Sequence, residues 1–165
     1  MKPSDHPEYF RLPPPPGRSR ESSIVLTRDG RFLHDGEPVE HLSMKRAFAS
    51  WLRRHPDDGR TILDNGYDWT YLQVEGSLSF VRSVRATADG LRAELLDGTE
   101  APLSAGDLAC DAEGVLTLRL PKGEPARFTP AAQLELSPWL AERGGQIGLQ
   151  IGGQFCPIEG AATRA

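Results

Sequence analysis

The chain has 165 residues, a length that suits one compact domain or two small fused domains. Hydrophobic residues make up 38% and charged residues 25%, which is enough apolar material for a core, and the formal net charge of −4 excludes the chain-wide basic surface of a nucleic-acid-binding protein. No apolar run approaches the roughly 20 residues of a membrane-spanning helix. The opening MKPSDHPEYF lacks the apolar core of a secretory signal, so we expect a cytoplasmic protein.

Residues 1–22 are expected to form a proline-rich, poorly ordered arm. Pro13 to Pro16 read PPPP, a sequence that favours polyproline II and buries nothing by itself. The segment is either a ligand for a partner protein or a stiff lead-in that lies on the domain surface. We favour the lead-in.

Residues 23–82 are predicted to form a first α+β unit that opens with a β-hairpin and continues into a helix. Strands are expected at residues 24–27 and 31–34, on either side of the turn R-D-G. A helix is expected from Ser43 to about Arg54, before Pro56, because apolar side chains recur on one helical face. That face consists of Met44, Ala47, Phe48, Trp51 and Leu52.

A second hairpin is predicted around Asn65-Gly66, because this dipeptide between apolar runs is a strong turn signal. In the strand that follows, alternate residues place an aromatic group on one face of the sheet. This face is either a binding surface or a surface that packs against the helix of Trp51. It consists of Tyr67, Trp69, Tyr71 and Gln73.

Residues 83–160 are predicted to form a second, β-rich unit with one helix, followed by a tail of residues 161–165. Thr129-Pro130 resembles the start of a helix, with a cap and a proline in the first turn. The helix is expected to run to about Arg143 and to be kinked or divided by Pro138. Cys110 and Cys156 have apolar neighbours and no paired spacing, so we expect two buried, reduced thiols without a metal.

The two units carry similar phrases, which predicts an internal duplication of hairpin, helix and return strands. GEPVEHLSMKRAFASWL begins at Gly36 and GEPARFTPAAQLELSPWL begins at Gly123. A glycine turn and a two-strand return follow each helix. Coincidence is the alternative, since G, E and P are common residues in this chain.

The run from Ile24 to Arg54 resembles the opening of the bacterial family called domain of unknown function 1285. The shared pattern is R-D-G, a strand with an aromatic residue and a histidine, G-x-P, and a helix that ends in L-R-R. The matching residues are Arg28, Asp29, Gly30, Phe32, His34, Gly36, Pro38, Phe48, Ala49, Leu52, Arg53 and Arg54. The ending GGQFCPI resembles the family's G-G-x-F-x-P through Gly152, Gly153, Phe155 and Pro157.

The chain departs from the family pattern in two places, so it resembles a divergent member. DNGYDWT at residues 64–70 replaces T-P-V-E-K, and VEGSLSF at residues 74–80 replaces V-E-D-A-P-F. The resemblance implies a duplicated α+β fold with a pleckstrin-homology-like C-terminal half. It also implies a signalling role, with a nucleotide-like ligand between the halves.

Catalytic motifs are missing from the sequence, which gives no catalytic residue, metal ligand or cofactor to name. The serines lie outside any G-x-S-x-G context, and neither G-x-G-x-x-G nor a Walker A motif occurs. His34 and Asp35 are adjacent, and adjacent strand residues point to opposite faces, so they are not expected to act together. Whether the protein is an enzyme stays open, with a binding module favoured.

Five residues are the predicted ligand contacts. Arg28, Arg31 and His34 on the first hairpin supply cations, and Tyr67 and Trp69 supply rings for stacking. We therefore expect a binding module for a small anionic, nucleotide-like ligand in a groove between the two halves. The alternative is a protein-interaction or homo-oligomerisation module that uses strand edges and the PPPP arm.

Overall fold

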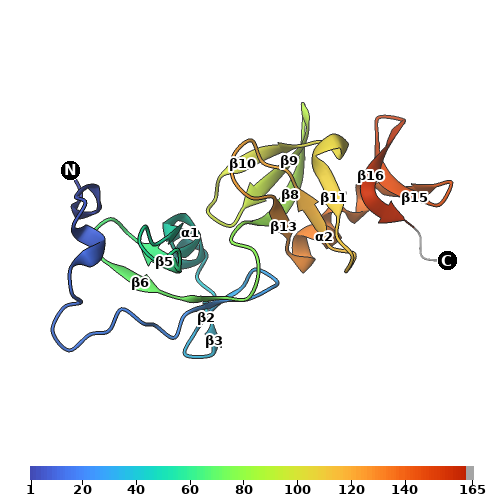
Figure 1. The fold of residues 1–165 in the computed structure, drawn as a ribbon. Helices are drawn as coiled ribbons and strands as arrows, with labels where there is room; N and C mark the ends of the chain where they lie inside the picture. Colours follow the sequence, from blue (N-terminus) through green and yellow to red (C-terminus); the bar gives the residue numbers. More distant parts are fainter. Residues whose placement is uncertain (163–165) are drawn as a thin grey trace. The chain divides into compact units, whose positions relative to one another are not determined.

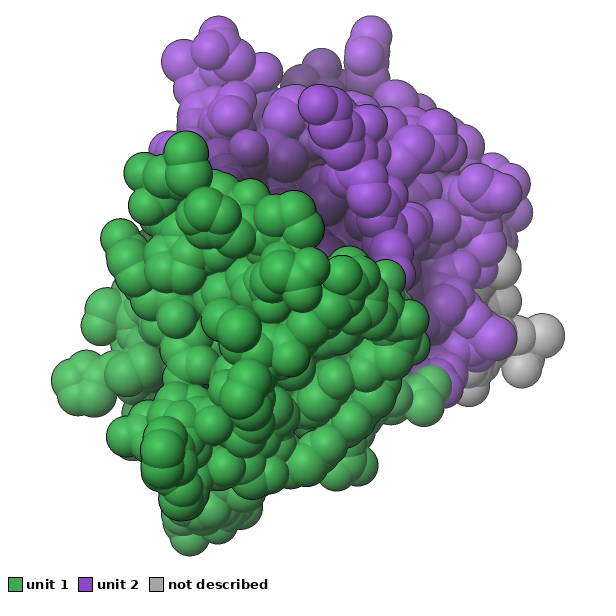
Figure 2. All heavy atoms as spheres, turned by 60° about the vertical axis from the view of Figure 1, so that its left-hand side comes forward, with its two compact units in different colours: residues 1–78 green, residues 79–165 purple. Residues whose placement is uncertain are grey.

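The computed structural model describes residues 1–162 and has an α+β fold that consists mostly of β-sheet (Figure 1). The chain divides into two compact units, shown in different colours in Figure 2: unit 1 contains residues 1–78, and unit 2 begins at Ser79. The division thus precedes the predicted boundary after residue 82. Of the predicted tail, residues 161 and 162 belong to the last strand, and residues 163–165 lie outside the described part. A search of the described residues found no helix with the length and apolarity of a membrane span.

Unit 1 combines one α-helix with two small sheets. One sheet has the strand order β3-β2-β1-β7, with β1 parallel to β7, and the other is the antiparallel meander β4-β5-β6. Both predicted hairpins are confirmed, as β1-β2 and β5-β6. The elements are η1 (Pro3–Asp5), η2 (Tyr9–Arg11), β1 (Val25–Leu26), β2 (Phe32–His34), β3 (Glu37–Pro38), α1 (Leu42–Trp51), β4 (Leu52–Arg54), β5 (Thr61–Asp64), β6 (Trp69–Tyr71) and β7 (Gln73–Val74).

In the described part of unit 2, the strands form one curled sheet of order β10-β9-β8-β13-β12-β11-β16-β15-β14. Helix α2 packs against β8, where Glu135 accepts hydrogen bonds from Ser83 Oγ at 3.0 Å and from the Val84 amide at 2.9 Å. The elements are β8 (Phe80–Thr87), β9 (Gly90–Leu95), β10 (Glu100–Leu103), η3 (Ala105–Asp107), β11 (Leu108–Cys110), β12 (Leu116–Leu118), β13 (Ala126–Phe128), α2 (Pro130–Leu136), η4 (Ser137–Trp139), β14 (Leu140–Arg143), β15 (Gln146–Ile151) and β16 (Gln154–Ala162).

The first helix is shorter than predicted. It ends at Trp51, and residues 52–54 form strand β4, in which Leu52 pairs with Leu63 of β5. The helical period continues through Leu52, but ladder hydrogen bonds to β5 override it, because local propensity is a weak determinant beside tertiary pairing. The predicted apolar face is also only partly covered: Phe48 and Trp51 are half-buried, and Met44 is 45% exposed.

The second helix begins where the sequence predicts. The Thr129 hydroxyl accepts a hydrogen bond from the Ala132 amide at 3.2 Å, which caps the helix. Pro138 falls in η4, and the chain then continues as β14 instead of a helix to Arg143. The proline therefore ends the helical region, as its missing backbone donor requires.

Two expectations about exposure differ from the structure. The N-terminal arm, predicted to be poorly ordered, contains η1 and η2, and its Tyr9 is buried. The arm gains this order because Tyr9 removes a large aromatic surface from water. Cys110 is half-buried and Cys156 is exposed, and both are free, so only one thiol has the partly apolar surroundings that we expected.

Candidate functional site

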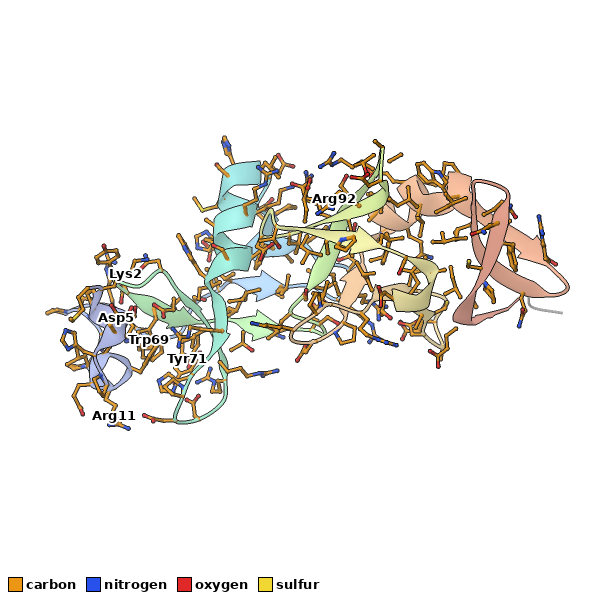
Figure 3. All side chains as sticks on the ribbon, turned by 90° about the horizontal axis from the view of Figure 1, so that it is seen from above. Lys2, Asp5, Arg11, Trp69, Tyr71 and Arg92 are labelled. Atoms are coloured by element: carbon orange, nitrogen blue, oxygen red, sulfur yellow. The ribbon has the colours of Figure 1, made fainter. Side chains whose placement is uncertain are left out.

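The aromatic face predicted on the strand after Asn65-Gly66 lies beneath the N-terminal arm. Tyr9 and Phe10 of the arm cover Trp69, with Phe10 and Trp69 ring centroids 6.2 Å apart. His55 lies 4.9 Å from the Trp69 ring and 5.6 Å from the Phe10 ring, and Tyr71 meets Trp69 edge-on at 5.1 Å. Figure 3 shows Trp69 and Tyr71 beside the arm that carries Lys2 and Asp5. The predicted strand is divided: β6 begins only at Trp69, so the arm covers Trp69 and Tyr71, whereas Tyr67 lies in the turn and is 68% exposed, and Gln73 is exposed on β7.

A buried carboxylate fixes the arm over this face. Tyr9 Oη donates to Asp64 Oδ1 at 3.0 Å, and Arg53 Nη1 lies 2.9 Å from Asp64 Oδ2. The Gly66 amide also donates to Asp64 Oδ1, at 2.8 Å. Burial, and then the hydrogen bond to Asp64, raise the pKa of Tyr9 well above its usual value. The phenol therefore stays protonated and keeps donating throughout the physiological range.

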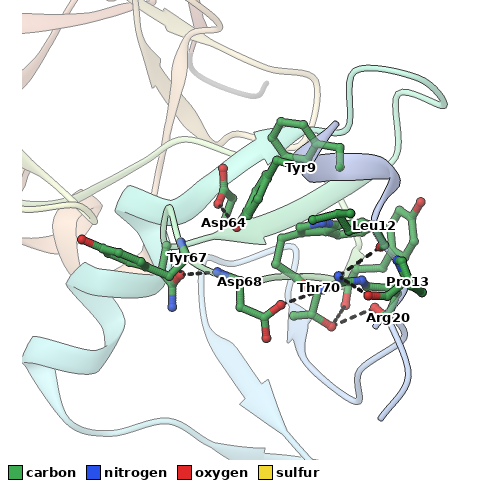
Figure 4. Close-up of polar contacts among 12 residues, drawn as sticks. Tyr9, Leu12, Pro13, Arg20, Asp64, Tyr67, Asp68 and Thr70 are labelled. Atoms are coloured by element: carbon green, nitrogen blue, oxygen red, sulfur yellow. Dashed lines mark hydrogen bonds and ion pairs between the residues drawn. The ribbon is translucent and has the colours of Figure 1, made fainter. Parts of the chain in front are cut away.

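Arg20 ties the proline segment to the sheet. Its Nη1 donates to Asp68 Oδ1 at 2.7 Å and to the Trp69 carbonyl at 2.8 Å, and its Nη2 donates to the Leu12 and Pro13 carbonyls at 3.3 Å (Figure 4). The guanidinium also lies 4.4 Å from the Trp69 ring centroid. One cation thus links the start of the polyproline segment to β6, which explains why this segment has a defined position.

A groove of about 630 Å³ lies between the arm and the turn that follows β5. Its apolar wall consists of Tyr9, Leu12 and the four prolines, and Tyr67, Arg20 and Asp68 complete it. Tyr67 is 68% exposed, so its ring is available at the edge of the groove. The Lys2 side chain lies against Gly66, the residue before Tyr67, and adds a cation beside this edge. The groove thus offers ring surfaces and nearby positive charge.

The cations of the first hairpin have carboxylate neighbours. Arg31 Nε lies 3.2 Å from Asp29 Oδ2, and the Arg28 amide donates to Glu75 Oε2 at 2.9 Å. The Thr27 hydroxyl and then Arg31 lower the pKa of Asp29, so this carboxyl stays charged. The hairpin is therefore less positive than its sequence suggests.

The structure does not bring the predicted contacts together. Trp69 begins β6, whereas Glu75, beside Arg28, follows β7. At about 3.3 Å per extended residue, the stretch from Trp69 to Glu75 can span up to about 20 Å. Tyr67 lies in the groove and Trp69 is buried, whereas Arg28 and Arg31 lie at the turn end of the first hairpin, near Glu75. His34 lies at the other end of that hairpin, next to the cross-strand pair Val25–Leu33. No single small ligand inside unit 1 would contact all of them.

His34 and Asp35 come closer than predicted. Asp35 has φ of 52° in the turn after β2, and its carboxylate lies 3.7 Å from His34 Nε2. The expectation of opposite faces failed because Asp35 belongs to a left-handed Asp-Gly turn and not to the strand. Both side chains are largely exposed, which gives the pair no protected site. Across residues 1–162, no group of three or more His, Cys, Asp and Glu side chains has an arrangement that could hold a metal ion.

The residues that hold the arm were not among the predicted site residues: they are Tyr9, Arg20 and Asp64. Tyr9-Phe10 is the signal that was available, because two adjacent aromatic residues in a polar, proline-rich segment are candidates for burial. The partner face lies more than fifty residues later, and local patterns carry no information about that pairing.

Comparisons with known proteins identify the fold. No family model matches the chain, and no curated protein matches it. The chain is similar to a DUF1285 family protein from Silicibacter pomeroyi DSS-3, with a TM-score of 0.55 and 22% identity over 94% of this chain and 87% of that one. It is also similar to a DUF1285 family protein from Shewanella baltica OS155, with a TM-score of 0.50 and 15% identity over 73% of this chain and 94% of that one. The chain thus shares its fold with the family of domain of unknown function 1285, which it resembles as a divergent relative.

Proposed function

We propose that unit 1 binds a small, nucleotide-like ligand, with a planar ring and an anionic group, and that it does so without turnover, in a signalling role. The groove under the arm is the observation that carries this proposal, because its volume of about 630 Å³ lies in the range of small-molecule sites. The predicted placement between the two halves stays a prediction.

The ring of the ligand would stack on Tyr67. This side chain is 68% exposed at the groove, and the facing wall is made of prolines and Leu12. Stacking on an aromatic side chain contributes about 1–3 kcal/mol and tolerates different bases. Of the two predicted stacking residues, Tyr67 is thus the one available to a ligand, while Trp69 supports the floor.

The anionic group would contact Lys2 beside the groove, with Arg20 nearby. Arg20 is already bound to Asp68, so Lys2 is the cation better able to accept a new anion. A hydrogen bond to a charged group contributes about 1.5–3 kcal/mol. With one stacked ring, these terms support micromolar affinity at best. The net charge of −4 disfavours a polymeric anion, which needs many cations.

A thermal-shift screen with nucleotides and phosphorylated metabolites at millimolar concentration, followed by calorimetric titration of each hit, tests the proposal. Tyr67→Ala should weaken binding about tenfold or more, and Tyr67→Phe should retain it. Leu134→Ala, an exposed change in unit 2, is the matched control. A triple Arg28→Ala, Arg31→Ala, His34→Ala variant tests the predicted cations. Equal affinity in wild type and Tyr67→Ala would exclude the groove.

An interaction module is the second candidate, and the exposed proline segment favours it. Leu12 is 56% exposed beside the four prolines, and Arg20 presents the segment in a fixed position. Strand edges support this candidate less. Pro38 and Pro102 lie on the edge strands β3 and β10, and the Arg20 carbonyl accepts a hydrogen bond from the Tyr71 amide at the outer edge of β6. If no compound raises the melting temperature, this function, including self-association, becomes the better one.

The matching topology of the two units supports the predicted duplication. Sheet order β3-β2-β1-β7 has its counterpart in β13-β12-β11-β16, each with one parallel pair. A helix and an antiparallel meander follow in both units, and both meanders begin directly after a tryptophan, at Leu52 and Leu140. We infer that β8–β10 precede the second repeat as an addition. The pleckstrin-homology likeness and the cytoplasmic location stay predictions.

A further inference from the structure

Unit 1 contains a second hollow between α1 and the meander, which shares only Asp68 with the groove. It has a volume of about 160 Å³ and is lined by Phe48 and Trp51 of α1, by Ile24 and by Leu63. Asp68 and Thr70 are among its polar residues. Leu63 and Thr70 are cross-strand partners and alternate with Asp64 and Trp69, so they lie on the face of the meander opposite the arm. Asn65 and Trp69 at the turn end of the meander complete the lining of this slot.

The corresponding region of unit 2 is closed. The meanders align through Leu52 pairing with Leu63 and Leu140 pairing with Leu149, so Leu149 corresponds to Leu63. The tryptophans that precede them align Leu136 with Phe48. Leu136 and Leu149 are buried in one core cluster, against which Trp139 packs. In unit 1 the same helical positions, Phe48 and Trp51, are only half-buried.

The closure in unit 2 has a visible cause. Strand β8 packs on α2, and Glu135 fastens the two through Ser83 and Val84. Ala47, which corresponds to Glu135, cannot make such bonds from α1. The apolar side of α1 therefore lacks the cover that β8 gives to α2, and the slot is the space that remains.

We propose that this slot binds one small aromatic ring of a neutral molecule, no larger than an indole. An apolar protein cavity of about 150 Å³ is known to take up benzene, so about 160 Å³ matches a single ring. Phe48 and Trp51 supply rings for edge or offset stacking. Asp68 supplies an acceptor at the rim, since Arg20 occupies Oδ1 and a carboxylate has further lone pairs. A ring with an N–H or O–H donor therefore fits best.

This site differs from the proposed groove in face, chemistry and probe. The groove is matched to an anionic ligand at Tyr67, whereas the slot takes a neutral ring at Phe48 and Trp51. Failure of the nucleotide screen would contradict the proposal for the groove but not the one for the slot. Absence of indole binding would contradict the proposal for the slot but not the one for the groove.

Indole is the probe, and amide chemical shifts of the full chain are the measurement. We expect saturable shifts at Phe48, Trp51, Leu63 and Thr70. The corresponding residues Leu136, Trp139, Leu149 and Cys156 form an internal control and should not shift. Methylation of the indole nitrogen should weaken binding about fivefold, because the donor to Asp68 is lost. Weak, unsaturable shifts in both units would overturn the proposal.

Two blocking variants complete the test. Ile24→Trp and Phe48→Trp should fill the slot and weaken indole binding about tenfold or more, whereas Leu42→Trp, at an exposed position outside both the slot and the groove, should retain it. An unchanged melting temperature and unchanged unit 2 shifts show that each variant is folded. Unaltered affinity in both folded blocking variants would overturn the proposal. Tighter binding of N-acetyltryptophanamide than of indole would also overturn it, in favour of a partner protein's side chain.

Discussion

The meander β4-β5-β6 of unit 1 and the meander β14-β15-β16 of unit 2 have the same hydrogen-bond framework and cover one face in different ways. Asp64 pairs with Trp69 in the first, and Gln150 pairs with Phe155 in the second. Ile62 pairs with Tyr71, whereas Gly148 takes the place of isoleucine and pairs with Pro157. The pairing pattern is the same, but the side-chain volumes on the face differ.

Unit 1 covers its face with a distant segment. Ile62, Trp69 and Tyr71 build a broad aromatic surface, and Tyr9 and Phe10 of the arm lie over it. Asp64 gives the arm a buried acceptor for Tyr9. This face therefore depends on residues that are far away in the sequence.

Unit 2 covers the corresponding face with its own strand. A Cβ at Gly148 would lie 2.8 Å from the tip of the Phe155 ring, so this ring lies over the glycine. Arg143 lies 5.4 Å from the centroid of the same ring. The absence of a side chain at Gly148 thus lets Phe155 cover the face. The comparison teaches that the side-chain volume on a sheet face decides whether a unit needs a distant segment to cover it.

The largest effect is expected from removing the arm's anchor. Tyr9→Ala deletes a buried aromatic side chain and should destabilise unit 1 by about 3–5 kcal/mol. Tyr67→Ala is the control, because Tyr67 is exposed and its loss should change stability by about 0.5 kcal/mol or less. Hydrogen exchange of β5 and β6 amides reports the loss. Equal protection in the two variants would mean that the arm does not stabilise the meander.

A smaller effect is expected from restoring a side chain in unit 2. Gly148→Ala places a Cβ against the Cys156 carbonyl oxygen as well as against Phe155, and should cost about 1–3 kcal/mol. Gly106→Ala is the matched control, because a Cβ there meets open space and should be neutral or slightly stabilising. Urea unfolding of both variants decides between them. A neutral Gly148→Ala would show that Phe155 does not close this face.

Alkaline pH should release the arm selectively. The pKa of Tyr9 is raised by burial and by Asp64, and the pKa of Tyr71 is raised chiefly by its hydrogen bond to Asp58. A tyrosine whose pKa is higher in the folded state than in the unfolded state stabilises the fold at any pH below its unfolded pKa of about 10. This stabilisation is lost as the pH rises from there through the folded pKa. Unit 1 should therefore lose melting temperature above about pH 10 while unit 2 loses less. Tyr9→Phe should flatten this dependence, and an unchanged slope would contradict the assignment.

The smallest effect concerns Gln150, the counterpart of Asp64. Its Oε1 is buried and, among the described residues, has no hydrogen-bond partner. Gln150→Leu should therefore be neutral or stabilising, within about 0.5 kcal/mol of neutral or better. Asp64→Leu should destabilise by about 1–3 kcal/mol, because the Tyr9 hydroxyl then lacks its acceptor. Thermal unfolding of Gln150→Leu and Asp64→Leu would test this. Similar losses of stability in the two variants would show that the polar residue has the same role on both faces.

Local chemistry made several elements predictable from the sequence. Asn65-Gly66 specifies a hairpin because the turn needs residues that tolerate positive φ, and Gly66 has φ of 90°. Thr129-Pro130 specifies a helix start, since a hydroxyl acceptor and a preset φ act within one turn. The order of hairpin, G-E-P turn and helix in each unit could be predicted because turn and capping residues also act locally.

Of the five residues predicted as ligand contacts, Tyr67 is the one that lines the groove, although the sequence placed it on a strand and the structure places it in the turn before β6. Tertiary structure decided the rest. Trp69 is buried under the arm, and Arg28 lies beside Glu75, away from the rings of Tyr67 and Trp69. Residues Leu52 to Arg54 form a strand instead of the end of the helix. Each of these outcomes depends on contacts between residues distant in the chain, such as Tyr9 with Asp64, and their energies exceed the local preferences that a sequence pattern records.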